Sequence, residues 1–268
     1  MIKQARAAFS MLNPEEVRER AEREVHVGLV ASGSRGYEEL EEFLSPRAPG
    51  RVHRADHPNP PATVDLVLYQ HGAQSNGDAY TFNRYQPAGL VRKILDDHDD
   101  FGLPLARQFP IFRKPVIDRV VQAVARENAL FSIATALPNV APTLFELPWT
   151  FGEFASDTVF LTGNQIRMAF VIAAACGAEV GFAHQKSAVL SIIGGAFGWR
   201  ALARELAGKI PLGGGLIPKG AIAYAGTVAV GKGLEFFYRT KRKPNRSERA
   251  EIYDSALTQG KEAAATLR

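Results

Sequence analysis

The segment with the strongest indication of chemistry is 31–38, which reads ASGSRGYE. A loop that binds nucleotide phosphates follows the pattern G-x-x-x-x-G-K-[ST]. Its backbone N–H groups surround the phosphates, its lysine reaches the β- and γ-phosphates, and its hydroxyl binds magnesium. Segment 31–38 keeps only the second glycine, Gly36, while Tyr37 replaces the lysine and Glu38 replaces the hydroxyl. We therefore predict no catalytic residue in this segment, and we assign none elsewhere in the chain.

The same segment keeps one property of a phosphate-binding loop. It lies between an apolar segment that favours a strand and an amphipathic segment that favours a helix, and the first N–H groups of a helix attract anions. We therefore predict that this turn can still present the N-terminus of a helix to an anion, through backbone N–H groups rather than side chains. The candidate nucleotide- or anion-binding residues are Ser32, Gly33, Ser34, Arg35 and Gly36.

Other sequence motifs of nucleotide hydrolysis are missing. A GTPase carries Asp-x-x-Gly for magnesium after its next core strand, but apolar segment 64–69 is followed by Gln70-His71-Gly72. The guanine-binding pattern Asn-Lys-x-Asp and the serine-hydrolase pattern G-x-S-x-G are also absent from the sequence. These observations favour a degenerate α/β scaffold. An atypical GTPase that binds GTP and magnesium through contacts such as Arg35 is the alternative.

Three further groups have spacings that resemble metal or phosphate sites. His53 and His57 flank an aspartate, and segment 97–100 is rich in acidic residues, but the histidines lie in a proline-rich segment that offers no rigid element. We interpret both as solvated surface and predict no metal and no cofactor. Segment 226–233, GTVAVGKG, matches part of the phosphate-loop pattern inside an alanine-rich helical run, so we interpret it as helix packing.

The charge of the 268-residue chain is unevenly distributed. Residues 1–150 contain 17 basic and 19 acidic residues, whereas residues 151–268 contain 15 basic and 9 acidic ones. The single cysteine, Cys176, lies in an apolar run and favours a buried thiol in a reducing compartment. Part of the basic excess forms a patch. We predict that this patch either faces an anionic lipid surface or is a solvated linker, and that it binds no nucleic acid. The patch consists of Arg239, Lys241, Arg242 and Lys243.

Apolar periodicity and turn residues predict the elements that position these groups. Strands are expected at 25–31 and 64–69, with 101–109 as a further short strand and 129–136 as either a strand or the start of an apolar domain. Alternation with helices indicates a parallel sheet. Three prolines at 137–148 mark a domain boundary. Helices are expected at 14–24, 37–44, 87–97, 112–127, 157–178, 187–209, 218–238 and 247–267.

These elements give an α/β domain at 25–148, preceded by an N-terminal helix at 1–24. An all-α, Gly-rich domain follows at 149–240, and a basic linker with a C-terminal helix occupies 241–268. Small residues at helical spacing allow two helix backbones to approach closely, so we predict helix packing or a membrane interface along 187–238. The residues concerned are Gly194, Gly195, Gly198, Trp199, Gly213, Gly214, Gly215, Ala225, Thr227 and Gly231.

Four segments of the C-terminal half carry a resemblance to a known family. They are NQIRM at 164–168, IIGGAFGWR at 192–200, KIPLGGGLIP at 209–218 and AGTVAVG at 225–231. Together they resemble the uncharacterised bacterial domain found associated with GTPases, over about residues 150–240. The N-terminal half resembles a P-loop GTPase domain in its layout. The resemblance implies a helical, membrane-associated module that is fused to a GTP-binding domain or encoded beside one.

From these observations we expect a non-catalytic protein that scaffolds or regulates a GTPase-linked system. Its expected partners are a membrane surface or bilayer, and a GTPase or another protein. Charged residues divide segment 187–238 into pieces too short for a clear span, so we expect a peripheral or partly inserted protein at the cytoplasmic face of a membrane. A soluble cytoplasmic protein with two domains is the remaining alternative.

Overall fold

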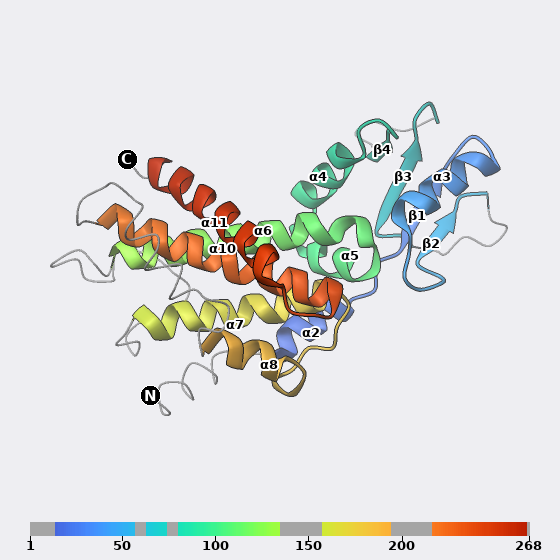
Figure 1. Ribbon diagram of the computed structural model, residues 1–268. Helices are drawn as coiled ribbons and strands as arrows, with labels where there is room; N and C mark the ends of the chain where they lie inside the picture. Colours follow the sequence, from blue (N-terminus) through green and yellow to red (C-terminus); the bar gives the residue numbers. More distant parts are fainter. Residues whose placement is uncertain (1–13, 57–62, 74–79, 135–156, 194–215, 267–268) are drawn as a thin grey trace. The chain divides into compact units, whose positions relative to one another are not determined.

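A computed structural model describes residues 14–56, 63–73, 80–134, 157–193 and 216–266 (Figure 1). The chain divides into two compact units. The sheet unit consists of Glu16–Asp118 and Ala174–Ala178, and the helical unit consists of Met1–Glu15, Arg119–Ala173 and Glu179–Arg268. Each unit is described by itself below.

The sheet unit contains a four-stranded sheet in the order β2-β1-β3-β4, and all its neighbouring strands are parallel. Central strand β1 pairs Val27 with Val52 of β2 and with Leu66 of β3. Alternate apolar residues of the two middle strands are buried, as a sheet with a covered face requires. The predicted parallel α/β arrangement is therefore confirmed. The strands are β1 Val27–Val30, β2 Val52–Arg54, β3 Leu66–Gln70 and β4 Tyr80–Phe82.

Helices follow β1 and β4 of this unit. Helix α3 connects β1 to β2 and buries Tyr37, Leu40 and Leu44, whose spacing of three and four residues places them on one face. Helix α4 has a proline in its first turn, which is a preferred start. The helices of this region are α2 Pro14–Glu22, α3 Ser34–Leu44, α4 Pro87–Asp97, η1 Asp99–Phe101, α5 Gly102–Gln108 and α6 Pro110–Ala134, the last of which continues into the helical unit.

The helical unit contains the second part of α6 together with α7 Asp157–Ala175, α8 Phe182–Ile193, α10 Leu216–Thr240 and α11 Arg246–Thr266. Helices α10 and α11 lie side by side (Figure 1). A Cβ atom on Gly260 of α11 would lie 2.8 Å from Ala225 Cβ and 3.0 Å from the Ala221 carbonyl oxygen, so the two backbones approach closely. Among the described residues, no helix is long and apolar enough to cross a membrane.

The structure corrects several element predictions. Strands β2 and β4 occupy segments that we assigned to loops, and each is only three residues long, too short for alternation to be visible. The predicted strand at 101–109 is instead η1 and α5, and residues 129–134 are the end of α6 rather than a strand. Helix α2, expected at 14–24, is mostly exposed and buries Val17 and Ala21.

Other predictions fall where the structure gives no description. The predicted boundary at 137–148 lies outside the described residues, as do residues 194–209 of the helix expected at 187–209. The two compact units divide within α6, between Asp118 and Arg119, and within α7, between Ala173 and Ala174.

Candidate functional site

The turn between β1 and α3 holds the predicted anion-binding residues. Only residues 31–33 separate the strand from the helix, so Ser34, Arg35 and Gly36 belong to the first turn of α3 rather than to a loop. Gly33 has φ +125°, a conformation that favours glycine. Its carbonyl oxygen accepts hydrogen bonds from Gly36 N at 3.0 Å and Tyr37 N at 3.3 Å.

A side chain from the neighbouring strand covers this turn. Gln70, the last residue of β3, accepts a hydrogen bond from Ser32 N through Oε1 at 3.3 Å. The same Oε1 lies where a Cβ atom on residue 36 would be, so only glycine admits the Gln70 side chain here. The packing of the Gln70 amide therefore explains why position 36 is a glycine. The glycine motif alone gave no signal for Gln70, whose partner is 34 residues away.

Tyr37 and Glu38, which stand at the lysine and hydroxyl positions of the phosphate-loop pattern, lie in different environments. Tyr37 is 3% exposed and belongs to the core beneath the sheet, where the Arg54 guanidinium lies 5.4 Å from its ring centroid. Arg54 also donates to Glu41 through Nε and Nη2 at 2.7 and 2.8 Å, and this pairing lowers the pKa of Glu41. Glu38 is exposed. Ser32, Ser34 and Arg35 are exposed as well, so the outer side of the turn is polar and open.

The histidine that we assigned to a solvated loop is part of the sheet. His53 lies on β2 opposite Gly28, and its Nε2 is 3.0 Å from Nδ1 of His26. The other ring nitrogen of His26 lies 3.7 Å from a Glu24 carboxylate oxygen. His57, its predicted metal partner, lies outside the described residues. Within the described parts of the chain, no three His, Cys, Asp or Glu side chains are arranged to hold a metal.

The helical unit contains a buried chain of polar side chains. Asn164 Nδ2 of α7 donates to Asn128 Oδ1 at 2.9 Å, and Asn128 Nδ2 of α6 donates to Thr227 Oγ1 of α10 at 2.9 Å. Thr227 Oγ1 in turn donates to the Ala223 carbonyl oxygen at 2.8 Å. Asn128 and Thr227 are fully buried. Burial also raises the pKa of the neighbouring Glu127 carboxyl, against the charge of Arg167 and a hydrogen bond with Asn164.

Thr227 and Asn164 both come from the segments that carry the family resemblance, and the structure brings them together through Asn128. The sequence pattern gave no reason to single out Asn128, which directly follows Arg126 and Glu127 in α6. Ala225 and Gly231 also pack closely, the first against Gly260 and the second against Val121 of α6. The other predicted packing residues, Gly194, Gly195, Gly198, Trp199, Gly213, Gly214 and Gly215, lie outside the described residues.

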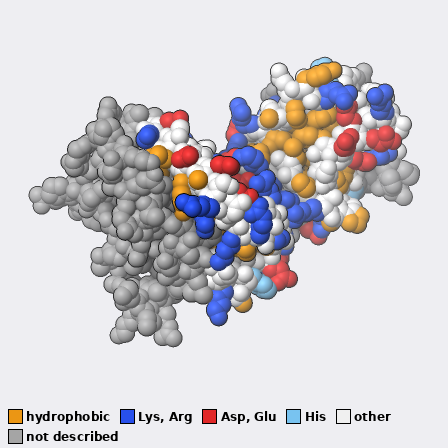
Figure 2. All heavy atoms as spheres, in the orientation of Figure 1, with side chains coloured by type: hydrophobic (Ala, Val, Ile, Leu, Met, Phe, Trp, Pro, Cys, Tyr) orange, Lys and Arg blue, Asp and Glu red, His pale blue; other side chains and the backbone are white. Residues whose placement is uncertain are grey.

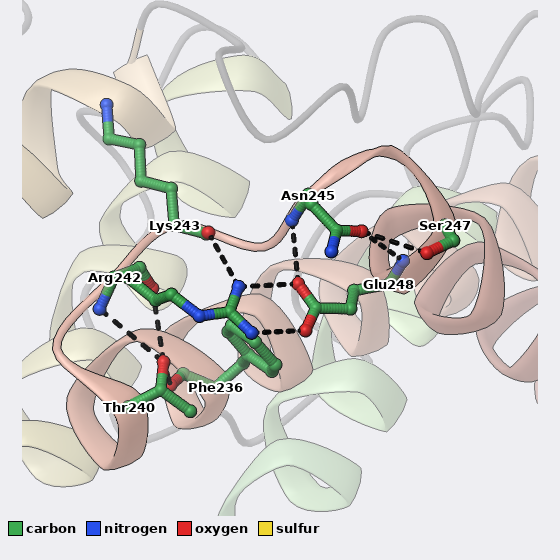
Figure 3. Close-up of polar contacts among 7 residues, drawn as sticks. All are labelled: Phe236, Thr240, Arg242, Lys243, Asn245, Ser247 and Glu248. Atoms are coloured by element: carbon green, nitrogen blue, oxygen red, sulfur yellow. Dashed lines mark hydrogen bonds and ion pairs between the residues drawn. The ribbon is translucent and has the colours of Figure 1, made fainter.

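The basic patch forms the turn between α10 and α11 (Figure 3). Arg242 is bound to the Glu248 carboxylate through both terminal nitrogens, and its guanidinium lies 4.8 Å from the Phe236 ring centroid. Glu248 N donates to Asn245 Oδ1 at 3.0 Å, and Asn245 N donates to Glu248 Oε2 at 2.8 Å. This reciprocal pair is a capping box that starts α11.

The residues of the basic patch differ in whether their charge is paired with a carboxylate. Hydrogen bonds from Arg242 and from the Asn245 backbone lower the pKa of Glu248 to about 2. Arg242 is thus neutralised within the turn, whereas Arg239, Lys241 and Lys243 are exposed. The Lys243 side chain points away from the Arg242–Glu248 pair (Figure 3). Figure 2 shows basic side chains among acidic and uncharged ones on the surface of the described residues.

Comparisons of the chain with protein-family models, with curated proteins and with solved structures gave no match. The family resemblance of segments 164–168 and 225–231 therefore remains a prediction. The described residues thus contain three candidate features: a polar turn closed by Gln70 in the sheet unit, and a buried polar chain across three helices and an exposed basic turn in the helical unit.

Proposed function

We propose that this protein is a non-catalytic scaffold or regulator in a GTPase-linked system and that it attaches to the cytoplasmic face of a membrane through the turn between α10 and α11. The observation that carries the attachment is the exposure of Arg239, Lys241 and Lys243 around the fixed Arg242–Glu248 pair. Arg239 lies in the last turn of α10, and Lys241 and Lys243 precede the capping box that starts α11, so the three charges are concentrated at one end of the helix pair.

The expected strength of membrane binding follows from the number of exposed basic side chains outside the Arg242–Glu248 pair. Each Lys or Arg near an anionic leaflet contributes about 1 kcal/mol, so the three exposed residues contribute roughly 3 kcal/mol, a factor on the order of a hundred in binding. Attachment of this kind is electrostatic, and it weakens as salt shortens the screening length.

The non-catalytic part of the proposal is supported by the turn between β1 and α3. We propose that the sheet unit is a degenerate P-loop-like domain. Tyr37, at the position of the phosphate-binding lysine, is packed in the core, and the Gln70 amide lies against Gly36. Neither residue is placed to hold a γ-phosphate or magnesium.

The attachment is tested by sedimentation of the full chain with vesicles of phosphatidylcholine alone or mixed with phosphatidylserine. Binding to the anionic vesicles is expected to fall roughly thirtyfold when Lys241→Gln and Lys243→Gln remove two charges of about 1 kcal/mol each. Lys186→Gln with Lys261→Gln, which also removes two exposed charges, is expected to leave binding nearly unchanged. Equal binding to both kinds of vesicle, or equal loss in both variants, refutes this attachment.

The open outer side of the β1–α3 turn favours one alternative, an atypical GTP-binding protein that uses Arg35. A nucleotide at a hundred times its dissociation constant adds about 2.7 kcal/mol of stability. Our proposal predicts that GTP with magnesium leaves the melting temperature unchanged. A saturable increase that Arg35→Gln abolishes supports the alternative instead.

A further inference from the structure

Three arginines of the sheet unit converge on one short segment. Arg47, which follows α3, donates from Nη1 to the Cys176 carbonyl oxygen at 3.1 Å. Arg107 of α5 donates from Nη1 to the carbonyl oxygen of Ala178 at 2.9 Å and of Ala174 at 3.4 Å. Arg113 of α6 donates from Nε to the Ala175 carbonyl oxygen at 3.1 Å. All these residues belong to the same unit, since Ala174–Ala178 is part of it.

The charges of this cluster are poorly balanced. The acceptors are neutral carbonyl groups at the end of α7, and a helix C-terminus supplies only about half of one negative charge. Within the described residues, none of the three arginines forms an ion pair with a carboxylate. Burial, together with the charges of Arg113 and Arg107, lowers the pKa of Arg47. Three cations thus face a single fractional negative charge.

The cluster also has unused donors and a fixed geometry. Nη2 of Arg113 is buried and has no hydrogen-bond partner among the described residues. Gly177 has φ +75°, and the Arg47 guanidinium lies where a Cβ atom on this residue would be. Only glycine therefore admits Arg47 against this turn. A buried guanidinium nitrogen without a partner carries a large desolvation cost unless an acceptor reaches it.

We propose that Arg47, Arg107 and Arg113 form a binding site for a phosphate group, either inorganic phosphate or the phosphate monoester of a larger ligand. A phosphate dianion supplies several acceptor oxygens and two negative charges, and its oxygens can accept paired hydrogen bonds from guanidinium forks. Arg47 is exposed and forms the outer side of the site, while Nη2 of Arg113 forms its buried side. This site is separate from the basic turn and does not depend on membrane attachment.

Titration calorimetry of the full chain with inorganic phosphate and with glycerol 3-phosphate, at constant ionic strength set by chloride, tests the proposal. We expect saturable binding of one equivalent. Tighter binding of the ester identifies an esterified phosphate as the ligand, and equal binding identifies the free ion. Arg47→Gln is expected to weaken binding about tenfold, the loss typical of one charge-assisted hydrogen bond. Arg126→Gln, at an exposed position farther along α6, serves as the matched control.

Arg113→Lys provides a second variant, because it keeps the positive charge and removes the planar fork. We expect it to weaken phosphate binding while the variant remains folded by circular dichroism. The proposal is overturned if neither ligand binds, if binding is the same in Arg47→Gln as in the unmodified chain, or if Arg126→Gln lowers the affinity as strongly as Arg47→Gln does.

Discussion

Removal of the buried polar chain in the helical unit is expected to destabilise the protein strongly. Thr227→Val deletes the acceptor of Asn128 Nδ2, and because Asn128 is fully buried, the amide is left without a partner at a cost of about 1–3 kcal/mol. Asn128→Ala removes the bonds to Thr227 and Asn164 and also opens a cavity. Its expected cost is about 2–4 kcal/mol.

The two substitutions share one hydrogen bond, so their effects are not additive. The double variant should cost about 1–2 kcal/mol less than the sum of the single variants, because each single variant already loses the Asn128–Thr227 bond. Urea unfolding followed by circular dichroism measures all four proteins, with the exposed Gln122→Ala on the same helix as the control. Additive costs, or a cost of Asn128→Ala no larger than that of the control, refute the coupling between α6 and α10.

Three further predictions follow from contacts described above. Gly36→Ala displaces the Gln70 side chain and should lower stability by about 1–3 kcal/mol. The double variant Gly36→Ala/Gln70→Ala should recover only part of this loss, because Ala31 Cβ would still lie 2.9 Å from the added Cβ atom. Gly260→Val separates α11 from Ala225 and should cost at least about 2 kcal/mol, or several degrees in melting temperature; no change shows that the helices do not touch. The folded pKa of Glu248 is depressed from 4.5 to about 2, so its contribution to stability is present above pH 4.5 and is lost as the pH falls toward 2. The melting temperatures of Glu248→Gln and the unmodified chain should therefore converge over this range, and a constant difference contradicts the ion pair.

The elements that could be predicted are those whose own sequence contains a clear apolar pattern and a recognisable start or end. Proline at the first helical position and four buried apolar residues place α4 at Pro87–Asp97, which matches the expected 87–97. The two core strands were also expected, since each is a run of apolar residues followed by a turn. Strands β2 and β4 could not be predicted in the same way, because three residues contain too little pattern and their pairing is supplied by β1 and β3.

The candidate site was predictable only in part, for a related reason. Ser32, Arg35 and Gly36 were singled out from their spacing, but the packing of Gly36 depends on Gln70, which reaches it from β3. Thr227 was singled out as a packing residue, whereas its hydrogen bond to Asn128 spans 99 positions of the chain. Likewise, the three arginines that meet at residues 174–178 come from three elements. Sequence spacing describes neighbours along one helix or strand, and these contacts join different ones.

The burial of Tyr37 limits how this chain can change during evolution. A single exchange of Tyr37 for lysine would restore the residue type of a phosphate-binding loop, yet it would place an ammonium group in the core beside the Arg54 guanidinium. Burial of a charge near a like charge strongly disfavours the ionised form, so the exchange would lose folding stability before any ligand was gained. A change of Tyr37 to lysine therefore lowers folding stability, whatever ligand the turn between β1 and α3 binds.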